Sequence, residues 1–328
     1  MTDLGSNYHK IIKPDKNGLK IATKELSNGG LVVIPTETVY GLGGDATNDD
    51  AVARIFAAKA RPSYNPLIIH FDKESSVWDH VLCNPIALKL AEKFWPGPLT
   101  MVLPKKNSSN ISELASAGLS TLAVRVPNHA ILLHILDHID FPLAAPSANR
   151  STYISPTRAK HTVGAFSKWF EIIVDGGPCS VGIESTVVAI DKSQVKILRP
   201  GGTTQDQLQS ALGEEIICNR KLRLNQSELP SSPGMLSRHY SPKAPISLNI
   251  KQAKPDGVLL GFGHNALKDA PNGSLNLSEN ASLTEAAANL FSMLRELDAL
   301  NPKRIYVSTI PNFGLGIAIN DRLKRAAI

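Results

Sequence analysis

Two short segments combine residue types that could bind a charged ligand. Residues 35–43 read PTETVYGLG, so small hydroxyls, a carboxylate and glycines follow the apolar run at 31–34. That run predicts a buried strand that ends at Pro35, and ligands of open α/β sheets bind beyond the carboxyl ends of the strands. Further along the chain, Lys59 and Arg61 supply two cations, which favour an anionic ligand such as a nucleotide.

Lys59 stands at the end of a helix that we expect to begin near Asn48. It continues the apolar stripe of this helix, and a lysine on a core-facing stripe either extends to the surface or meets an anion. The helix dipole also favours a cation at a helix C-terminus, which is the simpler interpretation of Lys59 alone. Because Arg61 and Asn65 follow directly, we expect a phosphate site here.

Two predicted strands, 66–71 and 121–126, each place a charged or titratable residue on the face opposite their larger apolar side chains. On the first strand this residue is His70, and a lone histidine of this kind is more often a satisfied core residue than a ligand. On the second strand, Arg125 shares its face with Thr121. A guanidinium cannot lose its charge, so Arg125 beside a hydroxyl is suited to a carboxylate or a phosphate.

Small residues in the segment 145–149, APSAN, would let a ligand approach the backbone, with Ser147 and Asn149 on one side. Ser155, followed by a proline, predicts a helix N-cap, and a phosphate at that N-terminus is the functional alternative. Residues 182–186, GIEST, precede a predicted strand and could form only a turn.

Several familiar chemistries lack their motifs in this sequence. It has no Walker A pattern and no recognisable nucleophile elbow. The glycines at 41 and 43 stand too far from the preceding strand for a dinucleotide-binding turn. We therefore expect a reaction that joins bound substrates directly, with cations stabilising the developing charge.

The 328 residues are 42% hydrophobic and 20% charged, which suits about two domains with a sizeable core. No apolar run approaches the roughly 20 residues of a membrane span, and the N-terminus lacks the apolar segment of a signal peptide. The three cysteines are far apart and without metal-ligand spacing, as in proteins of reducing compartments. These features predict a soluble cytoplasmic protein without membrane contact.

Alternating helical and extended patterns predict an α/β domain with a mixed sheet over residues 1–215. Residues 216–245 carry proline, serine and glycine without periodicity and predict a linker. A small βα unit follows over residues 246–328, with a helix start at Ser282 and Glu285. The strands expected in the large domain are 31–34, 66–71, 99–103, 121–126, 142–145, 171–174, 186–190 and 195–198.

The linker region is also basic. Between residues 216 and 251, six lysines and arginines accompany one acidic residue, Glu228. Such a segment attracts polyanions, although a solvated linker explains the same charges.

Many motifs, in one order, resemble the YrdC-like family. They are PTETVYGLG (35–43), KARP (59–62), NPLIIH (65–70), WPGPLT (95–100), VRVP (124–127), APSAN (145–149), GIESTVV (182–188) and RPG (199–201). The tail resembles the long form of this family, which carries an extra C-terminal domain, through SPGM (232–235), RHYSPKAP (238–245) and GLGIAINDRLKRAA (314–327). The resemblance implies an open twisted α/β sheet with a large basic cavity, joined to a small Rossmann-like α/β domain.

The same resemblance implies a threonylcarbamoyl-AMP synthase. Such an enzyme condenses L-threonine, bicarbonate or CO2 and ATP, and releases pyrophosphate. Magnesium (Mg2+) would accompany the ATP phosphates without protein ligands. The product would serve the threonylcarbamoyl modification of the adenosine beside the tRNA anticodon, with tRNA or downstream transfer proteins as partners.

Site residues follow from the resemblance motif by motif. Arg125 would bind the threonine carboxylate, Lys59 and Arg61 would stabilise charge during catalysis, and Tyr240 would fold over the cavity mouth. The residues expected around threonine are Thr38, His70, Arg125, Ala145 and Ser185. Those expected around ATP are Lys59, Arg61, Asn65, Thr121, Ser147, Asn149, Ser155, Arg199 and Tyr240.

Three places depart from the family pattern: residues 151–153, where a glycine is expected, residues 236–237, and Ser241 in place of alanine. They concern the loop before Ser155 and the lid rather than the reaction. Two other functions stay open. One is a non-catalytic RNA-binding or translation-associated module with a basic cavity, and the other is carbamoyl transfer as in hydrogenase maturation, which would normally need additional domains.

Overall fold

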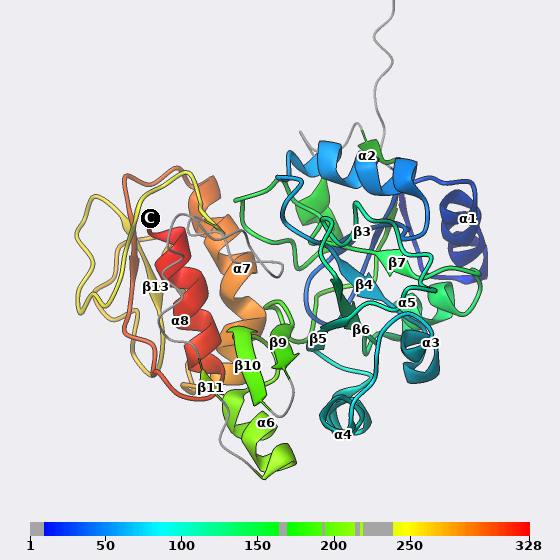
Figure 1. Cartoon of the computed structure of the whole chain (residues 1–328). Helices are drawn as coiled ribbons and strands as arrows, with labels where there is room; N and C mark the ends of the chain where they lie inside the picture. The colour runs from blue at the N-terminus through cyan, green and yellow to red at the C-terminus, as the bar shows by residue number, and fades with distance from the viewer. Residues whose placement is uncertain (1–9, 164–168, 192–193, 214–216, 219–238) are drawn as a thin grey trace, which may run out of the picture.

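The structure is a computed structural model that describes residues 10–163, 169–191, 194–213, 217–218 and 239–328. In these residues the chain forms a large mixed α/β domain and, beside it, a small domain with a parallel sheet (Figure 1). Most of the expected linker, residues 219–238, lies outside the described residues.

The large domain is built on a sheet whose described strands run in the order β1-β8-β2-β3-β7-β4-β6-β5-β9-β10-β11. Parallel and antiparallel pairs alternate in it irregularly, as expected for a mixed sheet. The strands are β1 (Lys10–Ile12), β2 (Val32–Ile34), β3 (Gly41–Asp45), β4 (Ile68–His70), β5 (Leu99–Pro104), β6 (Thr121–Arg125), β7 (Leu143–Ala144), β8 (Ile172–Val174), β9 (Thr186–Asp191), β10 (Gln194–Arg199) and β11 (Ile217–Cys218).

Helices of the large domain connect these strands. They are α1 (Lys16–Ser27), α2 (Asp49–Lys59), α3 (Glu74–Trp78), α4 (Pro85–Phe94), α5 (Ala130–Leu136), the 3-10 helix η1 (Ala159–Thr162) and α6 (Gln205–Leu212). The expected start of α2 is confirmed, because the Asn48 side chain accepts hydrogen bonds from the backbone N–H groups of Asp50 and Ala51. This cap sets the phase of α2 and with it the inward direction of Lys59.

The small domain contains four described strands, all parallel, in the order β12-β15-β13-β14. They are β12 (Ile246–Ser247), β13 (Val258–Gly261), β14 (Leu275–Asn276) and β15 (Ile305–Val307). Two helices, α7 (Leu283–Ala299) and α8 (Leu315–Ala326), complete it. The expected helix start is confirmed, since the Ser282 side chain accepts from the Glu285 N–H.

Helix α7 lies between α8 and the large domain (Figure 1). Its backbone approaches the segment before β9 so closely that a Cβ atom on Gly182 would lie 2.4 Å from the Ala288 Cα. One buried apolar cluster also spans both domains, because it joins Val39, Ile154 and Ile183 to the cores of α7 and α8. The two domains therefore share a core, and the small domain contacts the segments that carry the candidate site.

One strand was missing from the prediction, and one expectation about local structure is wrong. Residues 41–45, GLGGD, were not among the expected strands but form β3, which pairs with β2. Gly44 packs tightly there, since a Cβ on it would lie 2.7 Å from the Leu31 Cδ2. Ser155 does not cap a helix: the next helical residues are those of η1, and the Ser155 Oγ donates to Glu184 Oε1 at 2.6 Å.

Candidate active site

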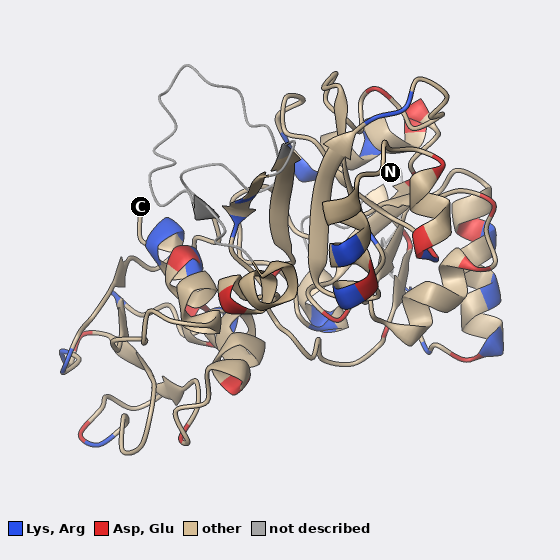
Figure 2. Ribbon diagram, turned by 60° about the horizontal axis from the view of Figure 1, so that its bottom comes forward, with Lys and Arg blue, Asp and Glu red and all other residues tan. Residues whose placement is uncertain are grey.

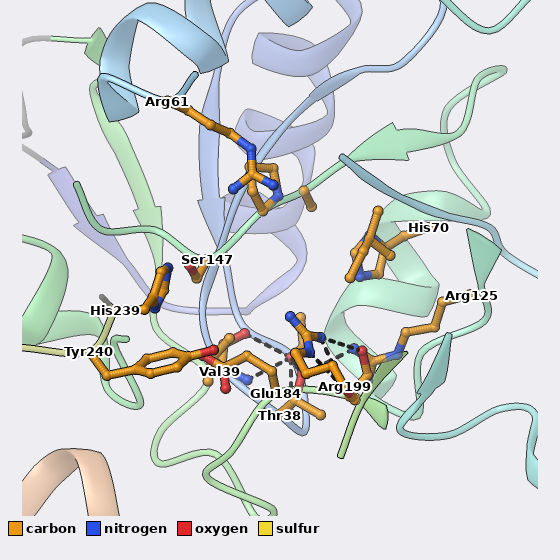
Figure 3. Close-up of a pocket in the computed structure, with 15 residues that line it drawn as sticks. Thr38, Val39, Arg61, His70, Arg125, Ser147, Glu184, Arg199, His239 and Tyr240 are labelled. Carbon is orange, nitrogen blue, oxygen red and sulfur yellow. Dashed lines mark hydrogen bonds between the residues drawn. The ribbon is translucent and has the colours of Figure 1, made fainter. Parts of the chain in front are cut away.

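A cavity lies at the ends of several strands of the large sheet, beside the small domain (Figure 3). The residues that line it are Thr36, Thr38, Val39, Arg61, Ile68, His70, Arg125, Ala145, Pro146, Ser147, Glu184, Ser185, Arg199, His239 and Tyr240.

His70 and Arg125 are neighbours because β4 and β6 are parallel and the two residues are paired in register. Both stand at the carboxyl ends of their strands, so their side chains enter the cavity at one edge of the sheet. Burial, and then the charge of Arg125, lower the pKa of His70 to about 3. His70 is therefore a neutral imidazole that can donate or accept hydrogen bonds without adding charge.

Arg125 is held by three groups before any ligand binds. Its Nε donates to the Gly97 carbonyl at 3.0 Å, its Nη1 donates to the Thr38 hydroxyl at 3.1 Å, and its Nη2 pairs with the buried Glu37 carboxylate. The Thr38 hydroxyl in turn lies 2.8 Å from the Thr36 hydroxyl. A guanidinium has five N–H donors, so donors remain for a carboxylate in the cavity.

Lys59 does not line the cavity but holds the loop that does. Its side chain is 1% exposed, and its Nζ donates to the backbone carbonyls of Ser147 and, at 2.6 Å, of Asn149. Burial, and then the charge of Arg61, lower the pKa of Lys59 well below its ordinary value. The lysine thus does not reach the surface in this structure. Its ammonium group is stabilised by hydrogen bonds to two backbone carbonyl oxygens.

Arg61 and Arg199 are oriented in a similar way. Arg61 donates through Nε to the Asn65 carbonyl at 2.9 Å and through Nη2 to the Asn65 Oδ1 at 2.7 Å. Arg199 donates through Nη2 to the carbonyl of Ser185 at 2.9 Å and to its hydroxyl at 3.1 Å. Asn65 is itself buried, so it acts on the cavity through Arg61.

The arginines crowd one another in the cavity. Burial, and then the charge of Arg199, lower the pKa of Arg61, and burial lowers that of Arg199. Because a guanidinium keeps its proton, these shifts mean that the free cavity is electrostatically unfavourable for its own cations. An anion bound between them would relieve this cost.

Glu184 and His239 line the cavity but were missing from the predicted site. Burial alone would raise the pKa of Glu184, but Arg322 and then Arg199 lower it to about 2. Glu184 is therefore ionised, and it accepts from Arg322 Nε at 2.8 Å. The signal for Glu184 was its place beside Ser185 in GIEST, whereas its partner Arg322 is far away in sequence.

Tyr240 forms part of the cavity wall and is 1% exposed. Its backbone has a φ of +64°, and its ring stacks on Phe291 of α7 with the centroids 5.4 Å apart. The flanking residues are fixed as well, because the N–H of His239 donates to the Arg325 carbonyl at 3.2 Å. The tyrosine is thus anchored to the small domain in this structure.

The cavity brings together most of the residues that the motifs singled out: Thr38, Arg61, His70, Arg125, Ala145, Ser147, Ser185, Arg199 and Tyr240. Lys59, Asn65 and Asn149 lie directly behind its wall and contact residues that line it or their loops. Thr121 stands at the opposite end of β6 from Arg125, and Ser155 lies behind Glu184. The cavity residues that lie within the motifs but were not predicted as site residues are Thr36, Val39, Ile68, Pro146, Glu184 and His239.

Within the described ranges, no group of three or more His, Cys, Asp or Glu side chains could hold a metal ion. Nor is any helix in that part of the chain long and apolar enough to cross a membrane.

The fold and site define a class: a two-domain α/β protein with a cationic cavity in its large domain, beside the small domain. Within this class, the chain belongs to the Sua5, YciO and YrdC family. Residues 24–201 match the family described as "Telomere recombination", and residues 203–328 match "Threonylcarbamoyl-AMP synthase, C-terminal domain".

Relatives of this chain resemble it over nearly their whole length. A curated Bacillus subtilis protein named threonylcarbamoyl-AMP synthase is 38% identical over 316 residues, which are 92% of this chain and 90% of that protein. A Pyrococcus abyssi protein of the same name is 37% identical over 323 residues, or 94% of each chain. The structure of P. abyssi Sua5 complexed with L-threonine has a TM-score of 0.88 at 34% identity and covers 97% of both chains.

Proposed function

We propose that this chain is a threonylcarbamoyl-AMP synthase, which condenses L-threonine, bicarbonate or CO2 and ATP to L-threonylcarbamoyladenylate and pyrophosphate. Its product would serve the threonylcarbamoyl modification of adenosine beside the tRNA anticodon. The names of the relatives support this proposal over more than nine-tenths of the chain. The observation that carries it is the cavity, where three arginines face a single carboxylate that Arg322 already neutralises.

Two parts of the cavity suit the two larger substrates. Figure 3 shows His70 and Arg125 together on one side, and His239 and Tyr240 on the opposite side. On the first side, Arg125 would bind the threonine carboxylate through its remaining donors. Around it, Thr38, His70, Ala145 and Ser185 would shape the pocket for the amino acid. The similar P. abyssi Sua5 was solved in complex with L-threonine.

The other side of the cavity would hold ATP. Arg61, Arg199, Ser147 and Tyr240 line the cavity and would contact the nucleotide directly. Three further predicted residues would act through the wall: Lys59 and Asn149 through the loop after β7, and Asn65 through Arg61. Roles for Thr121 and Ser155 in ATP binding remain predictions from the motifs.

The reaction would begin when the threonine amine takes up CO2 or bicarbonate to form a carbamate. A carbamate oxygen would then attack the α-phosphorus of ATP, forming a P–O bond as the bond to pyrophosphate breaks. Lys59, Arg61 and Arg199 would stabilise the charge that develops. Glu184 already binds Arg322 and Ser155, so it is not available to magnesium, and in this proposal magnesium binds to the ATP phosphates.

Mass spectrometry of the products tests the proposal. Purified protein would be incubated with ATP, magnesium and bicarbonate, and with threonine, serine or no amino acid. We expect threonylcarbamoyl-AMP and pyrophosphate with threonine and much less adenylate with serine. A folded protein that binds ATP but forms no adenylate would contradict the proposal.

The rival function is a non-catalytic RNA-binding module. Figure 2 shows basic and acidic residues interspersed along the ribbon of both domains, and part of the basic segment lies outside the described residues. RNA affinity that falls steeply with salt, together with no dependence on threonine, would favour this rival. Direct contact with tRNA or with downstream transfer proteins, and a cytoplasmic location, belong to the proposal as expectations.

A further inference from the structure

One side chain of the small domain reaches the carboxylate of the cavity. Arg322 on α8 is fully buried, with an exposed fraction of 0%, and its Nε lies 2.8 Å from Glu184 Oε2. Glu184 lines the cavity (Figure 3), whereas Arg322 is not among the residues that line it. The proposed reaction, as described above, gives Arg322 no part.

We propose that Arg322 is a positioning residue for the nucleotide side of the cavity, which it completes by neutralising Glu184 and supporting the ring of Tyr240. This inference rests on the proposed function and adds a role for the small domain to it. Arg322 does not touch the substrates; it acts through two residues that line the cavity.

The first step of the argument concerns charge. A ligand with several negative charges must enter a cavity whose wall contains the ionised Glu184. At short range a buried carboxylate repels phosphate strongly, because little water screens the pair. The guanidinium of Arg322 compensates this charge, and Ser155 occupies the other carboxylate oxygen at 2.6 Å. The negative charge of Glu184 is therefore compensated, and its side chain is fixed as part of the cavity wall.

The second step concerns Tyr240. The Cζ of Arg322 lies 5.2 Å from the centroid of the Tyr240 ring, and that of Arg325 lies 5.6 Å from it. Cations at such distances from an aromatic ring are attracted to its face. Phe291 of α7 stacks on the same ring, so both helices of the small domain hold the tyrosine.

The third step concerns how Arg322 itself is held. Its Nη1 lies 2.6 Å from Asp321 Oδ2, and the same oxygen lies 2.6 Å from Arg325 Nη2. The guanidinium is thereby fixed in one orientation between two carboxylates. An arginine that served only to hold the two domains together would not need to direct its Nε toward Glu184 in the cavity wall.

Arg295 provides a matched comparison. It is an arginine of α7 that is also largely buried and also crosses to the large domain, where it donates to the backbone carbonyls of Ile154 and Ser155. It contacts no carboxylate of the cavity wall in the described residues. Arg295 therefore resembles Arg322 as a domain contact but differs from it in the proposed role.

The experiment measures the kcat and the KM values for ATP and threonine in Arg322→Met, Glu184→Gln, the double variant and Arg295→Met, with urea unfolding of each. We expect Arg322→Met to raise the KM for ATP by roughly tenfold or more, because it leaves a buried carboxylate unpaired. The KM for threonine should change by less than about twofold. The double variant should recover much of the ATP affinity, since it removes both charges.

The control Arg295→Met should lower stability while leaving the KM for ATP near the wild-type value. Equal increases of this KM in Arg295→Met and Arg322→Met would overturn the proposal, because domain contact would then explain both. A double variant no better than Arg322→Met would also overturn it. If Arg322→Met does not fold, Arg322→Gln takes its place, because it also removes the charge while it keeps a hydrogen-bond donor, and an unchanged KM for ATP in that variant would overturn the proposal.

Failure of the inference and failure of the proposed function look different in this experiment. If the wild-type protein forms no adenylate, the proposed function is contradicted. If the wild-type protein forms adenylate but Arg322→Met leaves the KM for ATP unchanged, only the role of Arg322 is contradicted.

Discussion

Cations of the cavity are fixed by other residues before any ligand binds. Lys59 donates to two backbone carbonyls, Arg61 is held by Asn65, and Arg125 is held by Thr38 and its neighbours. Groups that are oriented in advance lose little entropy on binding and need no rearrangement when charge develops. The arrangement of donors, rather than the number of positive charges, thus distinguishes this cavity from a basic surface.

A change of Lys59 to methionine removes both the oriented hydrogen-bond donor and its charge. Lys59→Met should lower adenylate formation about 100-fold or more, because the loop at 147–149 loses its anchor and the site loses a charge. The free energy of unfolding should fall by about 1 kcal/mol or more, since the carbonyls of Ser147 and of the buried Asn149 lose their hydrogen-bond donor. Turnover and urea unfolding measure the two effects.

The control for this change is Lys24→Met, because Lys24 also stands in the last turn of a helix but is exposed. It should leave turnover within about twofold of wild type. Near-normal turnover in Lys59→Met would contradict the role of Lys59.

Replacing Arg125 by lysine tests the amino-acid side of the cavity. Lysine keeps the charge but cannot reproduce the planar guanidinium that contacts Gly97, Thr38 and Glu37 together. Arg125→Lys should raise the KM for threonine about tenfold or more and leave the KM for ATP nearly unchanged. Steady-state kinetics with each substrate varied in turn measure this, and parallel increases in both KM values would show that Arg125 serves the whole cavity.

At the scale of elements, the sequence predicted what depends on local pattern. All eight expected strands of the large domain are present within two residues of their expected bounds. Such strands can be predicted because their apolar residues follow one another, or alternate with polar ones, along the chain. β3 was not predicted because its glycines disfavour strands; in the structure Gly44 packs against Leu31, and Gly43 packs against Ile34. The ion pair between Glu184 and Arg322 could not be predicted from the sequence either, because it depends on how the two domains pack against each other.

Gly182 shows how closely the segment before β9 approaches helix α7. Its φ of +75° strains any other residue, and a Cβ there would lie 2.5 Å from the Ala287 carbonyl oxygen of α7. Gly182→Ala should therefore lower the free energy of unfolding by about 2 kcal/mol or more and loosen the contact with α7. Urea unfolding measures the first effect, and limited proteolysis between the domains measures the second.

Gly118→Ala is the matched control. Its φ of +72° carries the same backbone strain, but no atom lies within 4 Å of a Cβ at that position. We expect a loss of about 1 kcal/mol from the backbone conformation alone. Equal losses in the two variants would mean that the contact between Gly182 and α7 adds nothing to stability.

At the scale of the whole molecule, the two domains share one buried cluster and one cavity. Apolar residues of both domains pack together around Val39 and Ile183, and Tyr240 belongs to the same cluster. Separation of the domains would thus expose core surface and open the cavity wall at once. Binding and stability should respond together to conditions that charge the buried groups.

Acid supplies such a condition through the buried histidines of the cavity. Burial lowers the pKa of both His70 and His239 to about 3, whereas an unfolded histidine has a pKa of about 6.5. Above pH 6.5 neither state binds these protons, so stability is complete there. Between about pH 6.5 and pH 3 the unfolded chain binds protons that the folded chain refuses, so the free energy of unfolding falls as the pH falls.

Urea unfolding between about pH 7 and pH 5 measures this effect while Glu184, with a pKa of about 2, stays ionised. His161, whose pKa burial also lowers to about 3, adds to the same slope, so the comparison of variants identifies the share of the cavity histidines. Each buried histidine should contribute a slope of up to about 1.4 kcal/mol per pH unit. The double variant His70→Gln/His239→Gln should have a flatter pH dependence than wild type, whereas the exposed His138→Gln should not. An unchanged slope in the double variant would mean that the two histidines accept protons in the folded protein, which would place charge in the cavity that this structure keeps out.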